Sequence, residues 1–148
     1  MLDFELNTRF DVILCLFSAV GYLKTLDGVQ RAILQFAKHV APGGVILVEP
    51  WFSPDQWRPS TVHVVSTEAN DTKVVRMSRS DVNGRMSTVD FHYLVGDLAH
   101  IRHFRELHEL GLFTPEEMTA CFEDAGLPVR FDPDGLTGRG LYIARPRV

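Results

Sequence analysis

Two uninterrupted apolar runs, joined by one amphipathic segment, constrain the fold of this sequence more than any other feature. One run is Phe10 to Phe17 and the other is Val45 to Val48. Short runs rich in β-branched residues are typical of strands buried on both faces of a parallel sheet. Residues 26–40 carry apolar side chains at helical spacing, and Pro42-Gly43-Gly44 is predicted to stop this helix. The sequence therefore predicts a βαβ unit with a right-handed crossover.

The middle of the chain follows a different pattern. From about Thr61 to Leu112, apolar and polar residues alternate, as in Val89-Asp90-Phe91-His92-Tyr93. Turn signals interrupt the alternation at Ala69-Asn70-Asp71 and at Asn83-Gly84. These signals predict a half-exposed antiparallel meander, inserted in an α/β domain.

A second helix and two short strands are predicted to close the chain. Thr114 suits the N-cap, Pro115 the first helical position, and Glu116 and Glu117 the first turn. Gly126 is expected to end this helix. The segments Val129 to Phe131 and Gly140 to Ala144 are the predicted strands.

Composition excludes several classes of protein. The 148 residues are 45% hydrophobic and carry a net charge of −4, which allows a real core and gives no reason to expect nucleic acid. No apolar run approaches the roughly 18 residues needed to cross a membrane, and the first residues lack the pattern of a signal peptide. Cys15 and Cys121 fall inside apolar patterns, as buried reduced thiols do. A cytoplasmic protein fits these observations.

Two parallel strands and one crossover helix make a poor α/β core, because such sheets normally have more strands and are covered on both faces. The first apolar run also begins only about nine residues from the start of the chain. We therefore expect this sequence to be the second half of a doubly wound domain.

Several short motifs carry a family resemblance. The turn Ala41-Pro42-Gly43-Gly44 before a strand resembles the later half of class I methyltransferases that use S-adenosylmethionine (SAM). Further motifs resemble the sugar N-methyltransferases that make dimethylamino sugars such as desosamine and mycaminose on macrolide antibiotics. They are Leu16 to Leu23, Val48 to Phe52, Phe91-His92-Tyr93, His108 to Phe113 and Gly138-Arg139-Gly140-Leu141.

The resemblance implies a fold and a role for each segment of the chain. Residues 1–60 and 113–148 would belong to a Rossmann-like SAM-binding domain and supply strands four to seven of its sheet. Residues 61–112 would form an inserted antiparallel sheet that helps to hold the nucleotide sugar. The family's glycine-rich donor loop and ribose-binding acid would lie upstream of Met1. We therefore expect the isolated chain to bind SAM poorly and to be inactive.

The resemblance assigns the catalytic position to Tyr22, which follows the first predicted strand and would face the sugar amine. Carboxyl ends of parallel strands are where doubly wound sheets bind ligands. A phenol is a weak base near neutrality, so Tyr22 is predicted to orient the amine first and to accept a proton second. An aromatic side chain that merely caps the core is the alternative.

The resemblance also implies contacts with the methyl donor and with the sugar nucleotide. Leu16, Phe17 and Ser18 would lie beside the methionine part of SAM, with Met1 and Phe4 near its adenine; ordinary core packing is the alternative for Leu16 and Phe17. Arg139, between glycines, suits a diphosphate, and a solvated turn arginine is the alternative. Trp51 and Phe52 suit the sugar or thymine, and a hydrophobic lid between the sheet and the insertion is the alternative. The substrate-binding residues implied are Glu49, Trp51, Phe52, Ser78, Ser80, His108 and Arg139.

Three alternatives bear on function. His100, His103 and His108 superficially suggest a metal site, but no Cys or clustered carboxylate completes a set of four ligands, so no metal is expected. The chain could instead be a non-catalytic methyltransferase-like subunit that kept a dimer surface. It could also be a methyltransferase with another small-molecule acceptor, such as a glycopeptide. The sequence is compatible with a homodimer.

Overall fold

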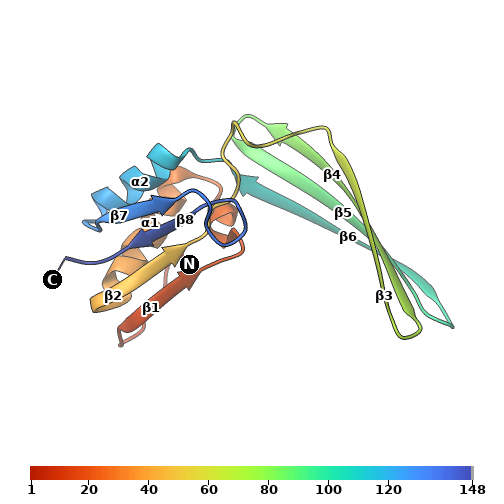
Figure 1. Cartoon of the computed structure of the whole chain (residues 1–148), viewed down its shortest axis with the longest axis horizontal. Helices are drawn as coiled ribbons and strands as arrows, with labels where there is room; N and C mark the ends of the chain where they lie inside the picture. The colour runs from red at the N-terminus through yellow and green to blue at the C-terminus, as the bar shows by residue number, and fades with distance from the viewer. Residues whose placement is uncertain (148) are drawn as a thin grey trace. The chain divides into compact units, whose positions relative to one another are not determined.

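A computed structural model of the chain describes residues 1–147 and divides it into two compact units (Figure 1). The first unit is formed by Met1–Gln56 together with Leu110–Val148, and the second by Trp57–Glu109. The first unit has helices on a mixed sheet, whereas the second is an antiparallel sheet. The predicted α/β fold with an inserted meander is confirmed.

The sheet of the first unit has the order β1-β2-β8-β7. Its strands are β1 (Phe10–Cys15), β2 (Val40–Val48), β7 (Val129–Asp132) and β8 (Leu141–Ala144). Strands β1 and β2 pair in parallel, β2 and β8 antiparallel, and β7 and β8 antiparallel. Helix α1 (Leu26–His39) connects β1 to β2, which confirms the predicted strand-helix-strand unit.

One hydrophobic core joins both helices to this sheet. It includes Ile33 from α1, Phe122 from α2 (Pro115–Asp124), and Ile46 and Tyr142 from the sheet. Helix α2 begins as predicted, because Thr114 caps it in a reciprocal capping box with Glu117. Burial raises the pKa of the Cys15 thiol to about 11, so this thiol stays protonated and packs as a small apolar side chain.

The prediction that Pro42-Gly43-Gly44 stops the helix is wrong. Helix α1 ends at His39 and the chain enters β2 at Val40, so these three residues lie inside the strand. The pairing of β1 with β2 shifts register at this point, as in a β-bulge. A Cβ atom at Gly44 would lie 2.8 Å from the Asp11 carbonyl oxygen. Glycine is therefore needed here so that the two backbones can approach.

Strand β1 is not buried on both faces, contrary to the prediction. Its residues Phe10, Val12 and Leu14 are 40%, 51% and 57% exposed, whereas Cys15 is buried. The cause is that α1 and α2 belong to one core on a single face of the sheet, and that β1 is an edge strand. An apolar surface of this kind is typical of a sheet that receives a second layer.

The second unit is a four-stranded antiparallel sheet of order β3-β4-β5-β6. Its strands are β3 (Val62–Ala69), β4 (Thr72–Asn83), β5 (Met86–Gly96) and β6 (Ile101–Gly111). The register places Val64, Met77 and His92 side by side on one face, and Val65, Arg76 and Tyr93 on the other. Among the described residues, no helix is long and apolar enough to span a membrane.

Candidate functional site

The chain makes an unusual turn directly after β1. Phe17 and Ser18 both adopt left-handed backbone conformations, with φ values of 54° and 59°. This conformation is uncommon for residues other than glycine and costs on the order of 1 kcal/mol or more at each position. The turn leaves the Phe17 side chain 82% exposed and buries Ser18. Strained turns that persist are held by their surroundings and gather at functional sites.

Glu49, the residue after β2, holds this turn in place. Its side chain is 1% exposed, and one carboxylate oxygen accepts a 2.6 Å hydrogen bond from the Phe17 backbone N–H. The Ser18 hydroxyl donates to the Pro50 carbonyl oxygen at 2.7 Å. The exits of β1 and β2 are therefore tied together by polar groups. A carboxylate this deeply buried requires such donors.

The other oxygen of the Glu49 carboxylate holds the loop before β8. It accepts a short hydrogen bond from the Thr137 hydroxyl and lies 3.6 Å from the Arg139 guanidinium. The Nε–H of Arg139 also donates to the Thr137 hydroxyl oxygen at 3.1 Å. Glu49 thus links its own segment to two others that are distant in the sequence. One carries Phe17, and the other carries Thr137 and Arg139.

The Arg139 guanidinium is held on an aromatic surface as well. It lies 5.6 Å from the centroid of the Trp51 ring and 5.8 Å from that of Phe52, within the range of cation–π contacts. These two rings meet edge to face at 4.8 Å. Gly138 and Gly140 flank Arg139 with left-handed φ values of 76° and 93°. The loop thereby presents a guanidinium of fixed orientation beside a cavity of about 70 Å³ lined by Pro50, Phe131 and Tyr142.

Tyr22 lies in a short 3₁₀ helix (Ala19–Leu23) that follows the left-handed turn. Its side chain is 48% exposed. A Cβ atom on the neighbouring Gly21 would lie 3.1 Å from the Trp51 Cβ atom, so this helix packs directly against the start of the aromatic surface. The structure therefore brings the segment carrying Tyr22 close to Trp51.

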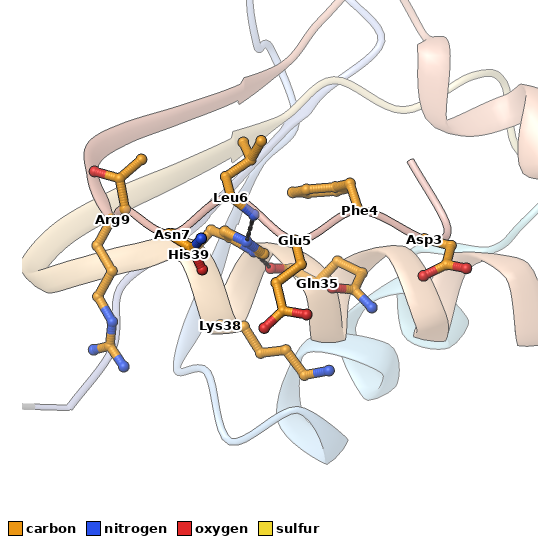
Figure 2. A pocket seen from close by; sticks show the side chains of 10 residues that line it. Asp3, Phe4, Glu5, Leu6, Asn7, Arg9, Gln35, Lys38 and His39 are labelled. Atoms are coloured by element: carbon orange, nitrogen blue, oxygen red, sulfur yellow. Dashed lines mark hydrogen bonds between the residues drawn. The ribbon is translucent and has the colours of Figure 1, made fainter.

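The predicted adenine contacts occupy two different places. The Met1 sulfur lies 3.7 Å from the Cys15 sulfur, at the end of β1. The Phe4 ring packs on the His39 ring at 4.7 Å, beside a pocket of about 550 Å³ that the N-terminal segment forms with α1 (Figure 2). His39 anchors this segment, because its Nε2 atom accepts a 3.0 Å hydrogen bond from the Leu6 N–H. Met1 thus lies beside Cys15 at the end of β1, whereas Phe4 lies against α1.

The predicted substrate residues of the second unit share one face of its sheet. Ser78 and Ser80 are buried at 6% and 7% exposure. The His108 ring meets the Phe91 ring edge to face at 5.1 Å, and the register pairs Phe91 with Ser78. The structure adds Arg76 to this group, because its guanidinium lies 5.0 Å from the Phe91 centroid. The two-residue spacing of Arg76, Ser78 and Ser80 could have identified it.

The described part of the chain holds no cluster of three or more side chains suited to a metal ion. His100 precedes β6, and His103 pairs with His92 through a 3.0 Å contact between ring nitrogens. The three histidines of the sequence motif therefore have different neighbours and do not converge on one site.

The chain is similar to several known proteins, which are named as methyltransferases of amino sugars or are related to them in structure. The chain is 41% identical over 147 residues to the dTDP-3-amino-3,6-dideoxy-alpha-D-glucopyranose N,N-dimethyltransferase of Streptomyces fradiae, covering 99% of this chain and 58% of that protein. The structure of DesVI from Streptomyces venezuelae matches with a TM-score of 0.94 and 36% identity, over 98% of this chain and 62% of that one. No family model matches the sequence.

A third match is a SAM-bound amino pentose methyltransferase of Micromonospora echinaspora, with a TM-score of 0.89 and 37% identity, over 98% of this chain and 61% of that one. The fold is therefore that of the SAM-dependent methyltransferases. Within this class, the chain is a homologue of the amino-sugar N,N-dimethyltransferases, as its motifs indicated. The chain spans about three-fifths of the length of the curated relatives it matches.

Proposed function

We propose that this chain carries the acceptor side of a SAM-dependent N-methyltransferase that acts on an amino sugar linked to dTDP, in antibiotic biosynthesis. One observation carries the proposal: a guanidinium held by the buried Glu49 and by two aromatic rings, in a homologue of enzymes named for dTDP-amino sugars. Arginine has five N–H donors in a planar fork. Since two of its nitrogens face Thr137 and Glu49, donors remain for a diphosphate.

The residues at the end of β1 fit one side of a donor site. SAM supplies an activated methyl group, so the protein mainly has to align two reacting atoms and exclude water. The fixed turn at Phe17 and Ser18 offers an exposed aromatic ring and an anchored backbone at the carboxyl edge of the parallel pair. Leu16 precedes this turn. We assign Leu16, Phe17 and Ser18 to the methionine end of SAM, and Met1 and Phe4 to its adenine.

The uncovered apolar face of β1 favours a donor domain larger than this chain. Val12 and Leu14 are more than half exposed, although they occupy a strand that is otherwise typical of a sheet covered on both faces. The curated relatives are longer than this chain. A natural form with a further layer on this face would complete the donor site, and activity is proposed for that form.

Tyr22→Phe tests the assigned catalytic position in that form. The change keeps the ring and removes only the hydroxyl. If the hydroxyl orients the amine, we expect the turnover number to fall by about tenfold or less, because alignment is largely retained. An obligatory base would cost about 10²–10⁴-fold. Steady-state kinetics with a dTDP-amino sugar distinguish the two roles. An unchanged turnover number would show that the Tyr22 hydroxyl does not act on the acceptor.

A further inference from the structure

Residues of the first unit are assigned to three parts of a dTDP-amino sugar. Tyr22 is assigned to the amine, and its 3₁₀ helix packs against Trp51. Arg139 is assigned to the diphosphate, and its guanidinium lies on the rings of Trp51 and Phe52. Since the sugar connects the amine to the diphosphate, these two rings suit the sugar. The thymine base, at the far end of the diphosphate, requires another surface.

One face of the second unit carries a connected group of polar and aromatic side chains. The register pairs Arg76 of β4 with Tyr93 of β5, and the Tyr93 hydroxyl donates to the Glu106 Oε2 atom of β6 at 3.2 Å. Phe104 lies on the same face as Glu106, because side chains two residues apart in a strand point to the same side. We call these four residues, which come from three strands, the polar cluster.

Contacts with neighbouring side chains hold the polar cluster in place. The Phe91 ring supports the Arg76 guanidinium, which lies 5.0 Å from its centroid, and meets the His108 ring edge to face. The His108 Nε2 atom lies 3.4 Å from Glu106 Oε2. Burial and the hydrogen bond to Glu106 raise the pKa of Tyr93, so this phenol remains a donor. A surface whose polar groups are already oriented loses less entropy when a ligand binds.

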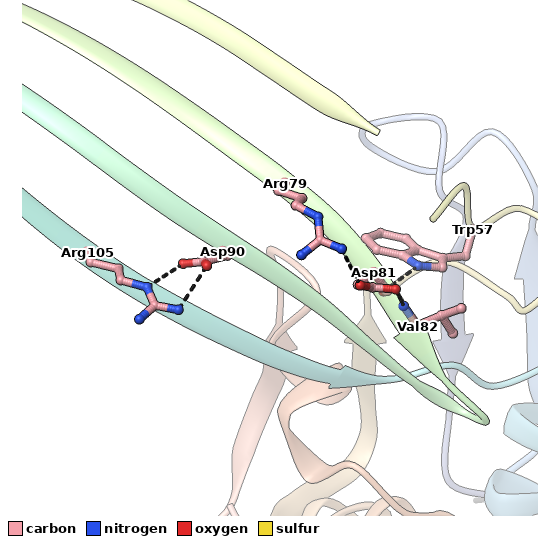
Figure 3. Close-up of polar contacts among 6 residues, drawn as sticks. All are labelled: Trp57, Arg79, Asp81, Val82, Asp90 and Arg105. Carbon is pink, nitrogen blue, oxygen red and sulfur yellow. Dashed lines mark hydrogen bonds and ion pairs between the residues drawn. The ribbon is translucent and has the colours of Figure 1, made fainter. Parts of the chain in front are cut away.

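The setting of Arg76 differs from that of two arginines on the opposite face of the sheet. Arg79 is paired with the Asp81 carboxylate at 2.7 Å, and Arg105 donates two hydrogen bonds to the Asp90 carboxylate (Figure 3). Arg76 instead lies on an aromatic ring, so the planar fork of its guanidinium keeps N–H donors for a ligand. Of these three arginines, Arg76 is therefore the one suited to a ligand.

The polar cluster matches the edge of a thymine base. Thymine presents an N3–H donor between two carbonyl oxygens, which requires an acceptor beside a donor. Glu106 accepts hydrogen bonds through Oε2, so its Oε1 atom can accept the N3–H, while Arg76 donates to a neighbouring carbonyl oxygen. Phe104 is 49% exposed and offers a ring for base stacking. A diphosphate fits less well, because the Glu106 carboxylate would repel it.

We propose that the polar cluster binds the thymine base of the nucleotide sugar and determines the choice of base. Glu106 accepts the N3–H group, Arg76 donates to a carbonyl oxygen beside it, and Phe104 stacks on the ring. This proposal rests on the proposed function, whose acceptor is linked to dTDP. Uracil has the same edge as thymine, whereas N3 of cytosine is an acceptor without a hydrogen. The Glu106 carboxylate would therefore face a lone pair in cytosine and select against it.

Calorimetry of the natural form with dTDP, dUDP and dCDP tests this choice, because the three nucleotides share the deoxyribose and the diphosphate. We expect dTDP and dUDP to bind with dissociation constants within about threefold of each other. That of dCDP should be about ten- to hundredfold higher, because a charged acceptor is left unsatisfied. Equal affinities for dTDP and dCDP would overturn the proposal, since the diphosphate would then explain binding. So would dUDP binding as weakly as dCDP, since the methyl group of thymine would then be recognised instead.

Two glutamate variants give a matched comparison. Glu106→Gln should lower the ratio of the dCDP to the dTDP dissociation constant at least about fivefold, because an amide also donates to N3 of cytosine. Glu68 lies on the opposite face with its side chain 70% exposed, and Glu68→Gln should leave the ratio unchanged. A merely structural role of Glu106 would weaken both nucleotides alike. An unchanged ratio in Glu106→Gln would therefore contradict base recognition.

The other contacts of the polar cluster are tested in the same way. Arg76→Ala should weaken dTDP binding about tenfold, whereas Arg79→Ala, on the opposite face, should change it less than about threefold. Phe104→Ala should weaken dTDP and dCDP by about tenfold each through lost stacking. Circular dichroism checks that each variant is folded. Equal effects of the two arginine variants would overturn the contact assigned to Arg76.

Failure of this proposal is distinguishable from failure of the proposed function, because binding is measured without turnover. A natural form that methylates a dTDP-amino sugar but binds the three nucleotides equally would overturn the recognition of the base alone. A natural form that does not bind dTDP would overturn both.

Discussion

Replacing Glu49 by glutamine is expected to lower the free energy of unfolding by about 2–3 kcal/mol, between the cost of a lost charged hydrogen bond and that of a broken buried ion pair. The carboxylate is 1% exposed and receives hydrogen bonds from the Phe17 N–H and the Thr137 hydroxyl. Glutamine keeps the shape, but it turns one acceptor into a donor and leaves Arg139 without its counter-charge. Urea denaturation measures the loss.

Glu123→Gln is the control for this change, because Glu123 lies on the exposed side of α2. Surface substitutions of this kind usually stay within about 0.5 kcal/mol. Equal stabilities of the Glu49 and Glu123 variants would show that Glu49 does not hold the turn and the loop together.

Arg139→Ala is expected to raise the Michaelis constant for the sugar nucleotide by about ten- to hundredfold, because a charge-assisted contact is worth about 1.5–3 kcal/mol. The turnover number should change little, since the diphosphate is remote from the reacting nitrogen. Steady-state kinetics in the natural form at saturating SAM separate the two constants. A fall in turnover without a change in the Michaelis constant would contradict an anchoring role.

Two matched variants refine this prediction. Arg139→Lys keeps the charge but loses the planar fork and much of the contact with Trp51, so an intermediate Michaelis constant is expected. Arg130→Ala removes an exposed arginine from β7 and should behave as the wild type. If Arg130→Ala had the same effect as Arg139→Ala, net charge rather than a specific contact would explain the result.

The sequence predicted the elements whose signals are local. The apolar run of β1, the helical spacing of α1 and the capping box at Thr114 each follow from a few neighbouring residues, and each is observed. The entry to β2 was predicted wrongly, because Pro42-Gly43-Gly44 is a common way to stop a helix. Here the same residues form a bulge in β2. Only the close approach of the Asp11 backbone to Gly44, which is visible in the structure, shows why glycine is needed.

The geometry of the site depends on contacts between distant residues. The left-handed turn at Phe17 and Ser18 contains no glycine, so the sequence does not indicate it. Glu49 holds this turn from 32 residues further along the chain. The Thr137 hydroxyl reaches the same carboxylate across 88 residues. A glutamate next to a proline would ordinarily be read as a surface residue. The family resemblance selected Glu49 and Arg139, but only the structure shows that one positions the other.

These contacts organise the site that we propose for the acceptor. Glu49 fixes the Phe17 turn through one carboxylate oxygen and the Arg139 loop through the other. A single buried group thereby sets the distance between the segment assigned to the donor and the residue assigned to the diphosphate. Because methyl transfer depends on the alignment of the reacting atoms, we expect small displacements of Glu49 to affect the binding of both proposed substrates.

The choice of acceptor shows whether this protein methylates an amino sugar. The natural form of the protein would be incubated with SAM and with either of two dTDP sugars that differ only in bearing an amino or a hydroxyl group at one carbon. Mass spectrometry of the products would then count the methyl groups transferred. We expect one or two methyl groups on the nitrogen of the amino sugar and none on its hydroxyl counterpart. Methylation of the hydroxy sugar alone, or no transfer to either sugar, would contradict it.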